Sequence, residues 1–193
     1  MTRIRIQSGA ALLTALFATA AVMLIGASAA QTALNAEKTA RYERDRHLAF
    51  QSAEAGLADA ERDIAGGARA ALFAEGQASA FTQGCGQAGL CRFMPADAPP
   101  AWQSADLADP AVSTPYGAFT GATLPGRPPR YIIELIASDP VAGHLYRITA
   151  IGFGLRSNTQ VVLQSICRKN GAAHLRVSWR EIANWQELHD AAT

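Results

Sequence analysis

The fold of this 193-residue chain is decided by its first third, which begins at residues 7–30 with QSGAALLTALFATAAVMLIGASAA. Two arginines, Arg3 and Arg5, precede this run, and the first acidic residue after it is Glu37. At helical rise, the uncharged residues 10–30 span roughly 30 Å, the thickness of the hydrocarbon core of a bilayer. The length and composition therefore predict a helix that can cross a membrane, with the arginines on the cytoplasmic side.

The helical pattern continues beyond the apolar run, over residues 31–65, QTALNAEKTARYERDRHLAFQSAEAGLADAERDIA. This stretch has no proline and one glycine, and it is rich in residues that favour helices. Apolar side chains recur at the spacing of one helical face, at Phe50, Ala53, Leu57, Ala60 and Ile64. Because Gly66 and Gly67 form a natural stop, we predict one helix from about residue 10 to residue 65. Its first half is apolar all round and its second half is amphipathic.

Residues 66–130 differ from the helix in composition. Glycine and alanine are frequent, and prolines recur from Pro95 to Pro129. Hydrophobic periodicity is weak, apart from a short helical pattern over 68–73. Long connections of this kind are usually functional or mobile. We interpret the segment as a variable loop region that runs over the surface.

The last segment, residues 131–193, predicts strands and a short tail. The strand patterns are rich in β-branched and aromatic residues and cover 131–137, 145–154, 159–167 and 173–182. Turn-forming residues separate them, and Asn170-Gly171 is the strongest hairpin signal among these. Strands joined by short turns form an antiparallel meander, one face of which the apolar helical stripe can cover. The sequence therefore predicts an α+β fold, with a long N-terminal helix packed on a C-terminal antiparallel sheet of about four strands.

Composition and motifs exclude several functional classes. The net charge is +1 and aromatic residues make up 7% of the chain, so neither a basic surface nor a stacking surface for nucleic acid is indicated. The histidines are scattered, and no zinc-protease, esterase or phosphate-loop signature is present. The G-x-G at 152–154 lies between two predicted strands, so it does not fit a dinucleotide site. We expect no enzymatic activity, no cofactor or metal, and no nucleic-acid partner.

The three cysteines, Cys85, Cys91 and Cys167, predict one disulfide if this part of the chain is exported. The spacing of Cys85 and Cys91 is too wide for a C-x-x-C redox motif, and one pair cannot form a four-ligand zinc site alone. The pairing stays open at this point. A Cys85–Cys91 bond would close a glycine-rich loop, whereas a bond from either of them to Cys167 would join that loop to a strand.

The apolar run has three interpretations. A cleaved signal peptide is supported by Ala27-Ser28-Ala29, which matches an A-x-A site, but the run exceeds the usual h-region of about 7–15 residues. The helical pattern also continues across that site. A permanent single-span anchor fits the length. In the third interpretation, the helix is trimmed at its front end and then used for assembly, because Gln7-Ser8-Gly9 ends a short basic leader directly before it.

The leader resembles the class III leader of type IV pilins, which a prepilin peptidase cuts after the glycine on the cytoplasmic face. The helix resembles that of the PilX-type minor pilins, with a G-A-A-L start and then an R-D-R-x-x-A-F-Q-x-A-E-A-x-L element. Here the second element comprises Arg44, Asp45, Arg46, Ala49, Phe50, Gln51, Ala53, Glu54 and Leu57. The resemblance covers about residues 7–62, and the strands with TQVVLQSIC and VSWREI are similar to the ending of that family.

This resemblance implies a pilin-like fold with a processed N-terminus. Cleavage between Gly9 and Ala10 would make Ala10 the new, N-methylated terminus. At the fifth position after the cut, major pilins carry a glutamate whose carboxylate pairs with the N-terminal amine of a neighbouring subunit. This chain has Thr14 at that position. A subunit without the carboxylate suits the end of a filament, where no amine ahead of it has to be neutralised.

The resemblance also implies an organisation and a set of partners. The segments are a leader (1–9), a transmembrane and assembly half of the helix (10–30), an amphipathic half (31–65), the variable loop region (66–130), and the sheet with its tail (131–193). The implied function is initiation of type IV pilus assembly at or near the pilus tip. The protein would first span the bacterial inner membrane with its C-terminus periplasmic, and then join the pilus at the cell surface.

The implied partners are the prepilin peptidase, other minor pilins, the major pilin, a tip-associated adhesin, and membrane lipid before assembly. Two alternatives stay open. One is a pseudopilin of a type II secretion system, since some of these also lack the carboxylate. The other is a single-span or secreted periplasmic binding protein with no pilus role.

Overall fold

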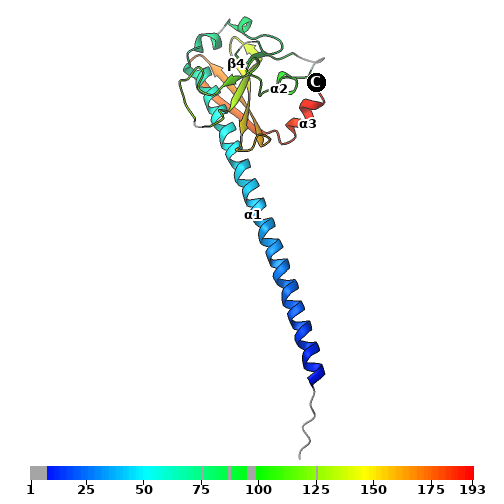
Figure 1. Ribbon diagram of the computed structural model, residues 1–193. Helices are drawn as coiled ribbons and strands as arrows, with labels where there is room; N and C mark the ends of the chain where they lie inside the picture. Colours follow the sequence, from blue (N-terminus) through cyan, green and yellow to red (C-terminus); the bar gives the residue numbers. More distant parts are fainter. Residues whose placement is uncertain (1–7, 75, 87, 95–98, 125) are drawn as a thin grey trace, which may run out of the picture. The chain divides into compact units, whose positions relative to one another are not determined.

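The structure is a computed structural model that describes residues 8–74, 76–86, 88–94, 99–124 and 126–193. The chain divides into two compact units, Met1–Arg44 and Asp45–Thr193, and each is described by itself. Helix α1, Ser8–Gly66, is continuous and contributes residues to both units (Figure 1). The prediction of one long helix that ends at the glycine pair is therefore confirmed.

In the first unit, every side chain from Ala10 to Arg44 is exposed. The most apolar 18-residue window of α1 has a mean hydropathy of 2.2, so the helix is long and apolar enough to cross a membrane. Its threonine hydroxyls donate hydrogen bonds to backbone carbonyls one turn earlier in the same helix, at Thr14, Thr19, Thr32 and Thr39. These hydroxyls therefore add little cost in an apolar environment.

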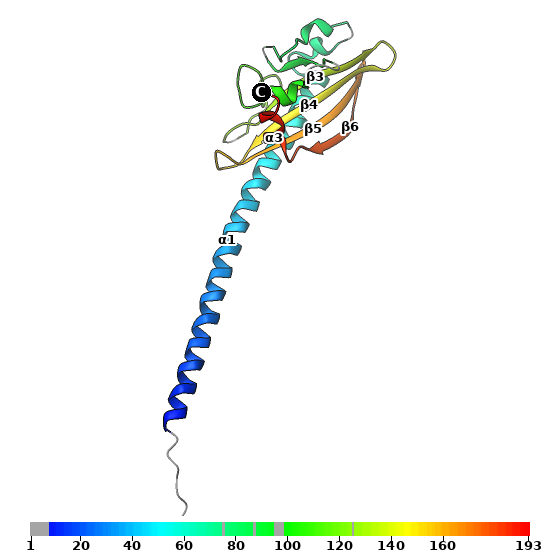
Figure 2. The same cartoon turned by 90° about the vertical axis from the view of Figure 1, so that its right-hand side faces the viewer.

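The second unit contains one six-stranded sheet in the order β1-β3-β4-β5-β6, with β2 paired to β3. The strands are β1 (Leu90–Arg92), β2 (Thr114–Pro115), β3 (Arg130–Asp139), β4 (Gly143–Phe153), β5 (Gln160–Asn170) and β6 (Ala173–Glu181). The long strands β3 to β6 lie side by side and are antiparallel (Figure 2), as the sequence predicts. The short strand β1 pairs with β3 in parallel and was not predicted.

One face of the sheet packs against the second half of α1. Ala53, Leu57, Ala60 and Ile64 are completely buried, and Phe50 packs against them from a partly buried position. Alternate residues of the central strands face this stripe: Tyr131, Ile133, Leu135, Tyr146, Ile148, Ala150, Val161 and Leu163. The 3,4 spacing on the helix and the alternation on the strands therefore meet in one apolar core.

The opposite face of the sheet is also covered, which corrects the interpretation of residues 66–130 as a surface connection. Trp102 from helix α2 (Ala101–Ser104) and Leu107 are buried against Ile132, Ile151 and Val162. Trp185 from helix α3 (Trp185–Asp190) joins this second cluster, and α3 lies beside α2 (Figure 1). The rest of the segment includes two 3₁₀ helices, Ala70–Phe73 and Ala78–Ala80.

Candidate functional site

The N-terminal part of α1 carries the residues expected to act in processing and assembly. Thr14 donates its hydroxyl to the carbonyls of Ala10 (3.2 Å) and Ala11 (3.0 Å) within its own helix. The threonine side chain carries no charge, and its single hydroxyl hydrogen is already engaged within the helix. Residues 1–7 of the predicted leader lie outside the described residues, and side chains are described from Ala10 onward.

The alanines of the family motif let the helix approach the sheet very closely at Gly152. A methyl group built on Gly152 would lie 2.2 Å from the carbonyl oxygen of Ala49 and 2.2 Å from the amide nitrogen of Ala53. Both alanines are completely buried. The A-x-x-x-A spacing therefore places two small side chains one turn apart, where the backbone of β4 touches the helix.

Asp45 of the motif holds the turn between β4 and β5. Its carboxylate accepts hydrogen bonds from the backbone N–H of Leu155 (2.5 Å) and the hydroxyl of Thr159 (2.6 Å). Gly154 passes so close that an added methyl group would lie 2.6 Å from an Asp45 oxygen. The acidic residue of R-D-R is therefore a structural contact between the helix and the turn.

Other motif residues join the helix to the outer strand β6. The ring of Phe50 meets that of Trp179 edge-on, with 5.9 Å between the ring centres. Arg46 pairs with Glu181 at 2.5 Å, although both side chains are partly exposed, so the pair adds little stability. Leu57 is buried, Glu54 is half-buried and Gln51 is exposed. Arg44 is exposed in the first unit.

A buried polar network at the end of α1, which was not predicted, holds the loop region. Asp63 pairs with Arg69 at 2.7 Å and accepts the hydroxyl of Tyr131 at 3.0 Å. Burial, with Asp63 alongside, raises the pKa of Tyr131 well above its ordinary value. One turn earlier in the helix, Asp59 accepts the backbone N–H of Gly117 at 2.7 Å. The two aspartates flank the apolar stripe on α1, but no sequence pattern identifies their distant partners.

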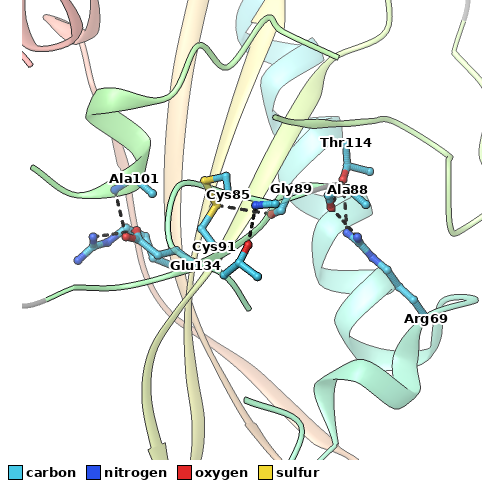
Figure 3. Close-up of a disulfide and its surroundings, with 11 residues drawn as sticks. Arg69, Cys85, Ala88, Gly89, Cys91, Ala101, Thr114 and Glu134 are labelled. Carbon is cyan, nitrogen blue, oxygen red and sulfur yellow. Dashed lines mark hydrogen bonds and ion pairs between the residues drawn. A yellow bond between two sulfur atoms is a disulfide. The ribbon is translucent and has the colours of Figure 1, made fainter. Parts of the chain in front are cut away.

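The disulfide joins Cys85 and Cys91 (Figure 3). Cys167 is a buried free thiol. Of the pairings left open by the sequence, the structure has the one that closes the glycine-rich loop. Arg69 donates to the carbonyl of Ala88 in that loop at 2.5 Å, and so does the hydroxyl of Thr114 at 2.6 Å. The loop is therefore tied to the end of α1 and to the start of β2.

On the other side of the disulfide, Glu134 joins the sheet to α2 (Figure 3). Its carboxylate pairs with Arg147 at 3.0 Å and accepts the backbone N–H of Ala101 at 3.3 Å. Burial raises the pKa of Glu134, and the neighbouring Arg147 opposes that rise. This buried acid is a structural contact, because its neighbours satisfy both of its oxygens.

Taken together, the motif residues build a helix–sheet junction, whereas the side chains of the apolar half of α1 are exposed. Among the described residues, no group of three or more histidine, cysteine or acidic side chains could hold a metal ion. The buried acids are held by structural partners within the fold. The arrangement can present an apolar helix to a membrane or to other helices, attached to a folded sheet domain.

A long N-terminal apolar helix whose second half packs on a mainly antiparallel sheet defines the pilin class of proteins. Two family models match the chain. The PilX N-terminal model matches residues 8–58, and the model of the type IV pilus assembly protein PilX C-terminus matches residues 80–169. The chain therefore belongs to the PilX family of type IV pilus minor pilins. This family is a structural pilus component and not a known enzyme family.

No curated protein matches the chain significantly, and no solved structure does so. The two family models together cover most of the chain, including the R-D-R element, the disulfide and strands β1 to β4.

Proposed function

We propose that this minor pilin takes part in initiating type IV pilus assembly and is located at or near the pilus tip. The observation that carries the proposal is Thr14, because its hydroxyl bonds back to its own helix and supplies no negative charge. In a bundle of apolar helices, an unpaired N-terminal amine is costly. A subunit that cannot neutralise a neighbour's amine therefore fits best where no such neighbour precedes it.

Processing would prepare the helix for assembly. In this proposal the prepilin peptidase cuts between Gly9 and Ala10, and the new amine of Ala10 is methylated. The helix holds the protein in the inner membrane until assembly, with the sheet domain in the periplasm. Residues 1–9 are then lost, and the apolar half over 10–30 remains part of the mature protein.

Assembly exchanges lipid for the helices of other pilins. Every side chain of α1 from Ala10 to Ala30 is exposed in its unit, as a surface that packs against other helices would be. Small residues permit close helix packing in an apolar environment. Within this segment they include Ala10, Ala11, Ala15, Ala18, Gly26 and Ala27. The partners in this step are other minor pilins and the major pilin, and a tip-associated adhesin is a further partner at the tip.

A deletion strain tests the role in the pilus. We expect loss of surface pili and their return when the wild-type gene is supplied, with pili counted by electron microscopy. A C-terminal epitope tag, placed after the exposed Thr193, should be detected by immunogold at pilus ends. Normal piliation together with failed protein secretion would contradict the proposal and support a secretion pseudopilin.

The substitution Thr14→Glu tests the role of the missing carboxylate. The added charge gives the subunit a partner for a neighbour's amine, so we expect severalfold more copies per pilus, distributed along the shaft. The matched control is Thr19→Glu, because Thr19, five residues further along, makes the same kind of backbone bond, to Ala15 at 3.0 Å. Quantitative mass spectrometry of sheared pili measures the copy number. An unchanged copy number for Thr14→Glu would show that residue 14 does not restrict the subunit to the end.

A further inference from the structure

A hollow of about 450 Å³ lies at the end of the sheet where α1 stops, and the proposed function does not use it. Its walls come from the first 3₁₀ helix, from β4 and from the β5–β6 hairpin: Phe73, Ala74, His144, Lys169 and Gly171. The volume lies within the range of pockets that bind small molecules. The walls combine an apolar side with two nitrogen-bearing side chains.

His144 is the first of these two side chains. It is only 6% exposed, and it lies on β4 directly opposite Lys169 on β5. Neither of its ring nitrogens has a hydrogen-bond partner among the residues that the structure describes. Buried polar side chains usually have such a partner. Both nitrogens lie beneath the surface, but the imidazole lines the hollow, so a rotation of the ring would turn one of them toward a ligand there.

Lys169 supplies the positive charge. It is 9% exposed, and its ammonium donates to the backbone carbonyl of Ile64 at 2.6 Å, which leaves other N–H donors for a ligand. The ring of Phe73 lies 5.9 Å from the ammonium nitrogen. Burial lowers the pKa of Lys169 because it disfavours the charged ammonium. A bound anion would stabilise that ammonium and offset the effect.

The charged groups nearby leave this lysine without an acidic partner. On β6, His174 is the residue opposite Lys169. Glu61 of α1 pairs with Arg176 at 2.6 Å and accepts the hydroxyl of Ser165 at 3.4 Å. Within the described part of the chain, no carboxylate forms an ion pair with Lys169.

We propose that this hollow is a binding site for a small molecule with a single carboxylate. One carboxylate oxygen would accept from the Lys169 ammonium and the other from an N–H of His144, while the body of the molecule lies against Phe73. A single lysine balances one negative charge. A phosphate dianion would call for a second cation or several backbone donors. The site is independent of the pilus role, because none of its residues is on the apolar half of α1.

Histidine-selective NMR tests the proposal on the full chain in detergent micelles. The ring nitrogens are labelled with ¹⁵N, and sodium acetate is added against equal concentrations of sodium chloride and of neutral acetamide. Glucuronate and glucose form a second pair of probes that adds a sugar body with and without the carboxylate. We expect the His144 signals to move in a saturable way with acetate and glucuronate only, while His47 and His189 stay unchanged.

Variants assign the effect to the hollow. We expect His144→Phe and Lys169→Met each to weaken acetate binding by about tenfold, as expected for loss of one charge-assisted hydrogen bond. For Lys169→Met, acetate binding is measured from the shift of the His144 signals. For His144→Phe, which lacks that signal, acetate binding is measured by calorimetry. The control Arg168→Met changes the next, exposed side chain on β5 and should leave binding within about twofold. Because Lys169→Met also removes the bond to Ile64, folding of each variant is checked by thermal unfolding.

Three results would overturn the proposal: no saturable shift of His144, an equal shift with chloride or acetamide, or unchanged binding in folded His144→Phe. The last two would mean that acetate acts only as an adventitious ion. A response to glucuronate that is much tighter than the response to acetate would support the site and identify an acidic sugar as the better ligand.

Discussion

At the scale of single residues, the two alanines of the family motif allow one close contact between α1 and the sheet. Ala49 and Ala53 are the small residues of A-F-Q-x-A, and they lie where Gly152 of β4 brings its backbone against the helix. A larger side chain at any of these three positions would push helix and sheet apart. The motif therefore specifies how the helix packs on the sheet at this point.

The substitution Gly152→Ala tests this contact. The added methyl group would lie 2.2 Å from backbone atoms of α1, which cannot move as a flexible side chain could. We expect a loss of about 2 kcal/mol in the free energy of unfolding, typical of an overpacked core. Denaturant titration of the full chain in detergent, followed by tryptophan fluorescence, measures it.

The control for this substitution is Gly66→Ala at the end of α1. No atom lies within 4 Å of the added methyl group, and alanine is the better helix former, so stability should be unchanged or slightly higher. Equal unfolding free energies for Gly152→Ala and the wild type would show that helix and sheet can separate at this point without cost.

At the scale of elements, the sheet is held between two covers of different origin. The second half of α1 covers one face through an apolar stripe, and α2 with α3 covers the other through the two tryptophans Trp102 and Trp185. The indole N–H of Trp185 donates to the carbonyl of Trp102 at 3.3 Å. Glu134 adds a bond from the sheet to the N-terminal residue of α2. Loss of Arg147, the ion-pair partner of Glu134, should therefore also weaken the packing of α2 on the sheet.

The substitution Arg147→Met should be strongly destabilising and depend on pH. Burial already raises the pKa of Glu134, and removal of the arginine would raise that pKa further. A pKa that is higher in the folded state means that stability is present at low pH and is lost as pH rises through the folded-state pKa. We expect a cost of about 3 kcal/mol at pH 8 that becomes smaller as the pH falls through the raised folded-state pKa, and that is smallest once the pH is below the usual glutamate pKa of about 4.

Urea titrations of the full chain in detergent, at several pH values, measure this dependence. The double substitution Glu134→Gln with Arg147→Met should remove most of the added pH dependence, because no buried charge remains at this position. Arg156→Met, in the exposed turn between β4 and β5, is the matched control and should change stability by less than about 0.5 kcal/mol. A cost that is the same at all pH values would contradict the account of Glu134.

At the scale of the whole molecule, the sequence predicts those parts whose signals are local. The 3,4 spacing, the glycine stop and the hairpin turns identify α1 and the four long strands. The second cover could not be predicted in this way. Trp102 and Leu107 have no periodic neighbours, and their burial depends on strands far along the chain. The disulfide pairing and the Asp63–Arg69 pair likewise depend on chain geometry and not on spacing.

The central claim is that the apolar half of α1 is kept and used for assembly after a short leader is removed. The most direct test is the N-terminus of the mature protein, determined by mass spectrometry of the protein from sheared pili and from inner membranes. We predict a chain that begins at Ala10 with a methylated amine. A chain that begins at Ala30, or one that retains Met1, would contradict it.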